Sequence, residues 1–318
     1  MSNNIDKNIL LVGASQMSID YFKVLSALDC NVTVVGRSVD SAKTFEQSTQ
    51  KNVITGGLHD FLKSNTTVFD SAIIAVGAEQ LVESQILLMN FGIKKILVEK
   101  PAGLSLSDIN KVSSLAKKLN VDLFVAYNRR FYSSVIKAKE IIEKDGGISS
   151  FNFEFTEWSH TIEPLKKKEG IKENWLLGNS SHVIDLAFYL GGAPAEIRCF
   201  AEGELNWHKH AIFCGAGKTK DNKLFSYQAN WIAPGRWGVD VLTTNNRLIF
   251  RPLEDLHIQE KGSVIIKKVE IDNDIDIQFK PGLFIQTKDF LMGNFVNLKS
   301  ISEQAEMFET YLMIANGN

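Results

Sequence analysis

Two side chains, Lys100 and His182, have the chemistry to exchange a proton with a substrate hydroxyl or carbonyl group. Oxidation of an alcohol needs a general base, and reduction of a ketone needs the matching acid. Lys100 follows the apolar run Lys95–Val98, so we expect it at the carboxyl end of a buried strand, where open α/β sheets bind ligands. A surface lysine before a turn is the alternative. An unperturbed histidine side chain titrates near neutral pH, so His182 is the second candidate, although a packed core histidine is its ordinary alternative.

Three charged residues could support this chemistry. The spacing of His182 and Asp185 puts both on one face of an expected helix over 180–190. Asp185 could then orient the imidazole, or it could only balance charge. Arg129 and Arg130 can bind a substrate carboxylate or phosphate through paired hydrogen bonds, or they can pair with acids of the protein itself.

A short turn between an expected strand and an expected helix has the sequence Gly13-Ala14-Ser15-Gln16-Met17-Ser18. The dinucleotide-binding fingerprint has glycine at the first, third and sixth positions of such a turn. Here the first glycine is kept and serine occupies the other two. Serine is small enough to let the backbone approach a pyrophosphate, and the helix N-terminus supplies N–H groups. We therefore predict a dinucleotide site, with an unliganded tight turn as the alternative.

The residues after the second expected strand bear on the choice of dinucleotide. NAD sites usually have an acid there that binds the ribose 2′-hydroxyl, whereas NADP sites accommodate the 2′-phosphate with an arginine. The sequence reads Val35-Gly36-Arg37-Ser38 and has no acid. Arg37 could face a 2′-phosphate and Ser38 could donate to it, which favours NADP(H) over NAD(H). A solvated loop arginine is the alternative.

The first part of the chain has the pattern of an α/β domain. Apolar strands are expected at 8–12, 31–35, 71–76, 95–98 and 122–126, with helices between them at 19–28, 80–90 and 106–119. Continuous apolar strands that alternate with helices indicate a parallel sheet covered on both faces. Right-handed crossovers then give a doubly wound sheet. We expect residues 1–126 to form a dinucleotide-binding Rossmann domain.

After Tyr127 the pattern changes to one of strands with few helices. A helix is expected at 132–144, another at 180–190, and a helical tail at 284–314. Strands are expected at 151–158, 196–202, 211–215, 225–231, 238–243, 247–250 and 264–271. This pattern is typical of an α+β domain with a large, open, mostly antiparallel sheet. We expect it to span 127–318 and to serve substrate binding and oligomerisation.

Several aromatic residues of this second part lie near expected strand ends. Glu157 and Trp158 follow a strand and could border a pocket, and Arg236 and Trp237 lie in a turn. Tryptophan faces can stack on sugars. For Trp231 and Trp237 we favour a covered sheet or a subunit contact instead.

The order of motifs resembles the glucose–fructose oxidoreductase/inositol dehydrogenase family (Gfo/Idh/MocA). The chain has Glu99-Lys100-Pro101 at a strand end, then Asn128-Arg129-Arg130-Phe131, then His182 and Asp185 in an HxxD motif followed by Leu190-Gly191-Gly192. The resemblance covers essentially the whole chain. It implies a Rossmann domain, a C-terminal α/β domain with an open sheet, and NAD(P)-linked oxidation or reduction of a sugar, polyol or sugar nucleotide. It also implies dimers or tetramers that meet sheet to sheet.

The motifs and the resemblance together indicate the site residues. Lys100 and His182 are the expected catalytic pair, in a cleft between the two domains. A lysine beside a cationic nicotinamide should have a lowered pKa and can serve as the acid or base. The expected cofactor contacts are Gly13, Ala14, Ser15, Gln16, Met17, Arg37, Ser38, Ala75, Val76, Glu99 and Lys100. The expected substrate contacts are Tyr127, Asn128, Arg129, Trp175, Asn179, His182 and Asp185.

The chain departs from the family pattern at two places. The family commonly has D-x-G-x-H-x-x-D, but here Gly178 and Ser180 stand at the Asp and Gly positions, with Asn179 between them. The family's T-P-N is replaced by Val76-Gly77-Ala78. Two alternatives therefore stay open. One is a catalytically silent, dinucleotide-sensing regulatory protein, and the other is a reductase of a non-sugar substrate such as a tetrapyrrole, as in biliverdin reductases.

Composition excludes several other classes. The 318 residues carry a formal charge of -2, so no basic field indicates nucleic acid or an acidic membrane as a partner. Three widely spaced cysteines favour a reducing cytosol over a disulfide framework. We expect no signal peptide and no membrane span, since no apolar run reaches about 18 residues. We also expect no metal site, because no cluster of ligands has suitable spacing.

Overall fold

The computed structural model describes residues 7–318, which divide into two compact units. The first contains the residues up to Asn128 and also Ile275–Glu306, and the second contains Arg129–Asp274 and Met307–Asn318. The first unit therefore takes a segment of the tail that the expected division at 126 and 127 assigns to the second domain. The reason is long-range packing, because strand and helix contacts bring 275–306 back to the parallel sheet.

The first unit is built on a seven-stranded sheet with the order β15-β6-β5-β4-β1-β2-β3. Its parallel strands are β1 (Asn8–Val12), β2 (Asn31–Val35), β3 (Val53–Ile54), β4 (Ser71–Ile74), β5 (Lys95–Glu99) and β6 (Asp122–Ala126). The short β15 (Lys299–Ser300) pairs with β6 in the antiparallel sense. The order of the six parallel strands is that of the Rossmann fold. Strands β2 and β3 are added on one side of β1, and strands β4, β5 and β6 are added on its other side.

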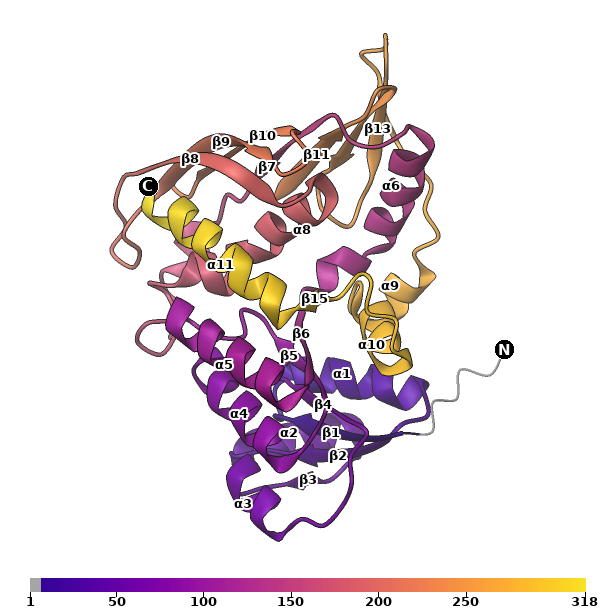
Figure 1. The fold of residues 1–318 in the computed structure, drawn as a ribbon, viewed down its shortest axis with the longest axis vertical. Coiled ribbons are helices and arrows are strands. Elements are labelled where there is room, and N and C mark those ends of the chain that lie inside the picture. The colour runs from indigo at the N-terminus through magenta and orange to yellow at the C-terminus, as the bar shows by residue number, and fades with distance from the viewer. Residues whose placement is uncertain (1–6) are drawn as a thin grey trace. The chain divides into compact units, whose positions relative to one another are not determined.

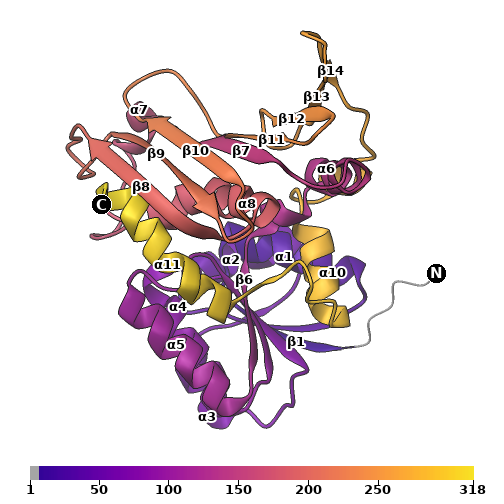
Figure 2. The same ribbon diagram turned by 45° about the horizontal axis from the view of Figure 1, so that its top comes forward.

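Helices cover both faces of this sheet, as Figure 1 and Figure 2 show. Right-handed crossovers put helices that lead from β1 to β3 on one face and those that lead from β4 to β6 on the other. The first group is α1 (Gln16–Ala27) and α2 (Val39–Thr49), joined by α10 (Leu283–Met292), which packs on α1. The second is α4 (Leu81–Phe91) and α5 (Leu106–Leu119). Helix α3 (Leu58–Ser64), which connects β3 to β4, packs against α4. The carboxyl ends of the parallel strands thus stay open at one edge.

The second unit is built on an eight-stranded sheet with the order β14-β13-β12-β11-β7-β10-β9-β8. All pairs of adjacent strands in this sheet are antiparallel except β7 and β10, which run parallel to each other. The strands are β7 (Ser150–Glu154), β8 (Pro194–Glu202), β9 (Ile212–Thr219), β10 (Leu224–Asn230), β11 (Gly238–Leu242), β12 (Asn246–Phe250), β13 (His257–Glu260) and β14 (Ile266–Lys268). The expected fold class, a Rossmann sheet followed by a large mostly antiparallel sheet, is confirmed.

The helices of the second unit cover one face of its sheet. Helix α8 (Ser181–Gly191) packs against β7 and β11 and is preceded by a π-helical turn, Leu176–Ser180. The core here is aromatic, because Phe153 lies 5.7 Å from Phe188 of α8 and 5.3 Å from Tyr227 of β10, centroid to centroid. Elsewhere in the described residues of both units, the helices are α6 (Ser133–Lys144), α7 (Ser159–Ile162), α9 (Asp274–Gln278) and α11 (Ile301–Asn316), and the 3₁₀ turns are Ala78–Gln80 and Asn128–Phe131.

Several expected elements differ from those observed. The strand expected at 151–158 ends at Glu154, since the chain then turns toward α7. The continuous helix expected at 284–314 is interrupted by β15, which pairs with β6. The segments α2, β3 and α3 lie where no element was expected, because their polar and short sequences carry little periodicity. Within residues 7–318, no helix is long and apolar enough to cross a bilayer.

Candidate functional site

The turn between β1 and α1 is shaped by Gly13. Its φ is +116°, and its N–H donates to Val35 O at 2.8 Å. A Cβ at this position would stand 2.3 Å from Ala75 O, inside any tolerable contact distance. The glycine is therefore required twice, once for its backbone conformation and once for the close approach of the chain after β4.

The two serines of the turn fix the start of α1. Ser15 is the N-cap, its side chain accepts from the Ser18 N–H, and the Ser18 side chain accepts from the Ser15 N–H, which makes a reciprocal capping box. Buried Ser18 also donates through Oγ to Ala75 O at 3.2 Å. Serine at the third glycine position of the fingerprint thus joins the helix start to β4. The N-terminus of α1, with its positive dipole end, faces the same open edge as the strand ends.

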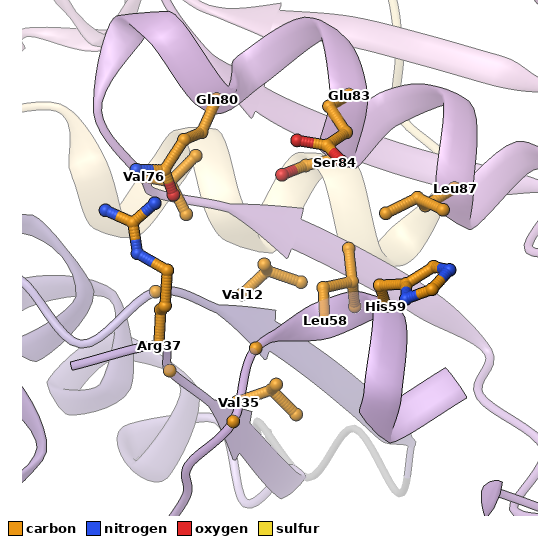
Figure 3. Close-up of a pocket in the computed structure, with 14 residues that line it drawn as sticks. Val12, Val35, Arg37, Leu58, His59, Val76, Gln80, Glu83, Ser84 and Leu87 are labelled. Carbon is orange, nitrogen blue, oxygen red and sulfur yellow. The ribbon is translucent and has the colours of Figure 1, made fainter. Parts of the chain in front are cut away.

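A pocket of about 200 Å³ opens beside this turn, and Figure 3 shows its lining. It is walled by Val12 and Val35 from the strand ends, Leu58 from α3, and Val76 after β4. Its polar groups come from Arg37, His59, Gln80, Glu83 and Ser84, and the remaining lining residues are Gly13, Gly36, Gly56, Gly57 and Leu87. Apolar walls with a few polar groups are typical of small-molecule sites.

Arg37 and Ser38 take different positions after β2. Arg37 is exposed and lines the pocket, and in the view of Figure 3 its guanidinium extends toward Val76 and Gln80. Ser38 is the N-cap of α2, where its side-chain oxygen accepts from the Ser41 N–H at 3.4 Å. Arg37 is thus available to a ligand in the pocket, whereas the side-chain oxygen of Ser38 already caps the N-terminus of α2.

Glu99 and Lys100 lie at the carboxyl end of β5, as expected. The buried Tyr21 hydroxyl of α1 donates to Glu99 Oε1 at 2.9 Å. Burial and the neighbouring carboxylate raise the pKa of Tyr21 well above its usual value, so this phenol stays protonated as a donor. Tyr21 therefore holds Glu99 at the start of the turn that presents half-buried Lys100.

The turn after Lys100 is held from two sides by glutamines. Ala102 has a left-handed φ of +71° and is fully buried. Gln85 Nε2 donates to Ala102 O at 2.7 Å, and Gln304 Nε2 donates to Pro101 O at 3.0 Å. A non-glycine residue in this conformation costs free energy unless its surroundings fix it. These two buried amides supply that support.

Tyr127 and Asn128 follow β6 within the first unit. The Tyr127 hydroxyl accepts from Gln304 Nε2 at 3.2 Å, and the Lys299 ammonium lies 5.1 Å from the centre of its ring. Asn128 Nδ2 donates to Pro281 O at 2.9 Å. Both residues were expected to contact substrate. Tyr127 is 1% exposed and is packed by its own unit, so its contacts here are structural.

In the second unit, Arg130 and Asp185 form a buried ion pair. The guanidinium donates from Nε at 2.7 Å and from Nη2 at 2.8 Å to the two carboxylate oxygens. It also lies 4.6 Å from the centre of the Tyr189 ring. Of the alternatives considered from the sequence, charge balance is the one that this geometry favours for Asp185, and pairing within the protein is the one it favours for Arg130.

Glu157 is the centre of a polar cluster in the chain that follows β7. It is 2% exposed, and its Oε1 accepts from Asn179 Nδ2 at 2.9 Å and from Ser180 Oγ at 2.8 Å. Its Oε2 accepts from Arg236 Nη1 at 3.3 Å. Burial raises the pKa of Glu157, and these donors, together with Trp237, act against that rise.

Trp237 joins this cluster to His182. The two rings lie 6.3 Å apart, centroid to centroid. The guanidinium carbons of Arg129 and Arg236 each lie 4.8 Å from the Trp237 ring centre. Trp237 is buried within its own unit, so the covering of this ring requires no second subunit. His182 thus lies beside a tryptophan that two arginines also contact.

The strand order explains why these residues meet. β7 lies between β10 and β11, and Glu154 is level with both Gln228 and Gly238. The connection 231–237 between β10 and β11 must therefore cross the end of β7. It crosses closely, since a Cβ on Gly235 would stand 2.4 Å from Glu154 Oε1. Arg236 and Trp237 are thereby brought to the chain that follows β7.

The expected site residues fall into two groups by unit. At the open edge of the Rossmann sheet lie Gly13, Ala14, Ser15, Gln16, Met17, Arg37, Ser38, Ala75, Val76, Glu99 and Lys100, with Tyr127 and Asn128 after β6. The second unit contains Arg129, Trp175, Asn179, His182 and Asp185, and Trp175 packs edge-on against Trp207 at 6.1 Å. Sequence reasoning missed His59, Gln80 and Glu83 of the pocket, although the glycines at 56 and 57 mark a turn there.

Comparison with known proteins adds a family context. Over 112 residues the chain is 30% identical to myo-inositol 2-dehydrogenase of Thermotoga maritima, and the match covers 35% of this chain and 33% of that enzyme. The matched part is therefore about a third of that relative's length. No family model matches the chain.

Solved structures match nearly the whole fold. Levoglucosan dehydrogenase in complex with NADH and L-sorbose has a TM-score of 0.79 at 16% identity, covering 98% of this chain and 96% of that one. UDP-N-acetylglucosamine 3-dehydrogenase from Acidithiobacillus ferrooxidans has a TM-score of 0.75 at 13% identity, covering 98% and 97%. The chain therefore has the fold of these dehydrogenases, which agrees with the resemblance expected from the motifs.

Proposed function

We propose that this protein is an NAD(P)-dependent oxidoreductase that acts on a secondary alcohol or ketone of a sugar or sugar nucleotide. The observation that carries the proposal is the Gly13 turn, whose backbone lies against Ala75 in a space that no side chain could share. It stands beside a helix N-terminus and an apolar-walled pocket. The relatives named above act on sugars, polyols or sugar nucleotides by their names, which supports the substrate class.

The residues of the first unit fit a dinucleotide. The turn Gly13–Met17 with the N-terminus of α1 would hold the pyrophosphate, and the pocket would take the adenosine side. When bound, the nicotinamide gives or takes a hydride at the reacting carbon. Between the pocket and Lys100, the dinucleotide would contact Ala75 and Val76, which follow β4, and Glu99, which Tyr21 holds.

We assign proton transfer to and from the substrate oxygen to Lys100 and His182. Lys100 is the main acid or base, because its turn is held by two buried amides and the nearby positive charge of the oxidised cofactor would favour its neutral form. His182 orients the substrate oxygen or shares the proton. Asn179, Arg129 and Trp175 of the second unit would contact the substrate.

We assign NADP(H) as the preferred cofactor. Arg37 lines the pocket, and Gly36 before it offers no carboxylate to a ribose 2′-hydroxyl. Fluorescence titration should therefore give tighter binding of NADPH than of NADH. Arg37→Asp should weaken NADPH by about 1.5–3 kcal/mol, the worth of a hydrogen bond to a charged group. Lys43→Asp makes the same charge change on exposed α2 and should leave both affinities unchanged. Tighter binding of NADH would overturn the assignment.

A catalytically silent, dinucleotide-sensing protein is the second candidate, and Gly178 in place of the family's Asp favours it. Both candidates bind NADPH. They differ in turnover, so absorbance of the reduced nicotinamide during incubation with sugars, polyols and sugar nucleotides separates them. If a tetrapyrrole oxidises NADPH in the presence of the protein and none of the sugars does, the hypothesis of a biliverdin-like reductase is supported.

We further propose a homo-oligomer in a reducing cytosol. Phe200, Ile212 and Leu224 share the face of the second sheet opposite α8, and they are 63%, 37% and 64% exposed. An exposed apolar sheet face of this kind is typical of an interface. Light scattering at micromolar protein should give the mass of a dimer or tetramer, and a strictly monomeric mass would contradict this. The reducing cytosol is proposed because the three cysteines are odd in number and widely spaced in the sequence.

A further inference from the structure

Arg236 is a guanidinium fixed in position but still open to a ligand. Its ion pair with Glu157 joins a side chain that is 44% exposed to one that is 2% exposed. In residues 7–318, Glu157 is the only hydrogen-bonding partner of the guanidinium, and Nη1 makes that bond. An arginine has five N–H donors in a rigid fork. Most of its donors are thus unused by the protein, on a group whose position is set from below by a buried carboxylate.

Aromatic rings fix the plane of this guanidinium. The Cζ atom lies 4.9 Å from the Trp158 ring centre and 4.8 Å from that of Trp237. Trp158 is itself held, because its Nε1 donates to Gly235 O at 2.8 Å in the same crossing loop. Stacking of arginine on indole rings restrains the side chain without occupying its donors. Less conformational entropy is then lost when a ligand binds.

The Glu157 carboxylate does not serve Arg236 alone. It accepts from Asn179 and Ser180 on its other oxygen, so it joins the guanidinium to the π-helical turn before α8. A surface ion pair made only for stability would need no such framework, because exposed pairs contribute little. The framework instead holds the exposed edge of Arg236 in one place. That place is next to the proposed chemistry, since Trp237 contacts both Arg236 and His182.

From this arrangement we infer that Arg236 binds an oxyanion group, a carboxylate or a phosphate, that the substrate carries on or next to its sugar ring. A planar guanidinium pairs with both groups through two parallel hydrogen bonds. The inference rests on the proposed function in that it takes His182 as the site of reaction. It makes the substrate an acidic sugar or a phosphorylated sugar rather than a neutral one, with Arg236 and Trp237 as specificity residues.

The test is calorimetric measurement of ligand binding to the 318-residue chain without dinucleotide. The probes are D-glucose, its carboxylate analogue D-glucuronate, D-glucose 6-phosphate and inorganic phosphate. We expect at least one acidic probe to bind tenfold or more tightly than D-glucose. Arg236→Gln should remove that preference, and Arg236→Lys should keep only part of it because the fork is lost. Comparison of the two acidic sugars tells carboxylate from phosphate recognition.

Arg251→Gln is the matched control. Arg251 is also half-exposed, at 49%, and also pairs with a glutamate at the end of β7, since its Nη1 donates to Glu154 at 2.9 Å. Glu154 alternates with Phe153, so it faces away from α8. This variant should keep the preference for acidic probes. Circular dichroism and thermal melting report whether each variant is folded.

Two results would overturn the inference: a wild-type protein that binds no acidic probe more tightly than D-glucose, or a folded Arg236→Gln variant that keeps the preference. NADPH titration of the same samples reports separately on the proposed function, because the residues proposed to bind the dinucleotide lie in the other unit. Acid preference without NADPH binding would reject the dehydrogenase proposal and leave the oxyanion site standing. NADPH binding without a preference for acidic probes would reject the oxyanion site and leave the dehydrogenase proposal standing.

Discussion

Both carboxylate oxygens of Asp185 accept hydrogen bonds from one buried guanidinium, that of Arg130. The pair joins the 3₁₀ turn after β6 to the middle of α8, so its loss should loosen the helix that presents His182. Breaking a buried pair leaves one charge without its partner and costs about 3–5 kcal/mol. We expect that loss of unfolding free energy for Arg130→Met in urea denaturation.

A double variant and a surface variant complete this experiment. Arg130→Met with Asp185→Leu removes both charges and should recover much of the lost stability, because an apolar pair often replaces a buried ion pair at little cost. Lys137→Met removes a member of an exposed pair on α6 and should change stability little. A single variant at Arg130 as stable as wild type would contradict the prediction.

Gly13→Ala should damage both folding and nucleotide binding. The added Cβ would meet Ala75 O at 2.3 Å, and a non-glycine residue at a φ of +116° is strained. Gly92→Ala isolates the strain, because Gly92 has a φ of +104° with no atom of the described chain within 4 Å of its Cβ position. We expect Gly92→Ala to cost about 1–3 kcal/mol and Gly13→Ala to cost more. Only Gly13→Ala should abolish NADPH binding in fluorescence titration, and equal effects would show that the contact with Ala75 is unimportant.

Lys100→Met should reduce hydride transfer while sparing cofactor affinity. The substitution keeps bulk but removes the proton-transfer group, which is worth about 10²–10⁴ in rate. Single-turnover absorbance of the reduced nicotinamide measures the rate, and NADPH affinity should stay within a few fold. Lys111→Met, an exposed lysine on α5, is the control. His182→Ala should cost less than Lys100→Met, and an unimpaired Lys100→Met rate would refute the assignment.

Glu157 should make stability depend on pH in one direction. Burial raises the pKa of its carboxyl in the folded protein, so the folded state holds this proton more tightly than the unfolded state. Stability from this group is then complete below the ordinary glutamate pKa, about 4.3, and falls as pH rises toward the folded-state value. Glu157→Gln removes that dependence. Urea unfolding from pH 4 to 7 should show wild type losing stability relative to Glu157→Gln, and a relative gain would mean that the pKa is lowered.

The parts of the fold that the sequence predicts well are those that local pattern determines. The strands at 8–12, 31–35 and 122–126 and the helix at 106–119 have the expected limits, because apolar residues at strand or helix spacing end there at polar or glycine positions. The segment 39–49 was missed as a helix, since it is largely polar and packs through only Ala42 and Phe45.

The parts that could not be predicted depend on long-range pairing. Arg236 was recognised only as a residue of a turn, because its contact with Glu157 exists only where the connection 231–237 crosses β7. The return of 275–306 to the first unit depends likewise on long-range contacts, namely the packing of α10 on α1 and the two-residue pairing of β15 with β6. Neither pairing leaves a mark in the local sequence.

That returning segment has a consequence for the order in which the protein matures during synthesis. The N-terminus of a chain leaves the ribosome first, and domains generally fold as they emerge. The first six strands of the Rossmann sheet are complete once Ala126 is made, but Gln304, which holds the turn after Lys100, is made almost two hundred residues later. The nascent sheet can therefore pack its own helices early, while the turn after Lys100 gains this support only after residue 304 has been made.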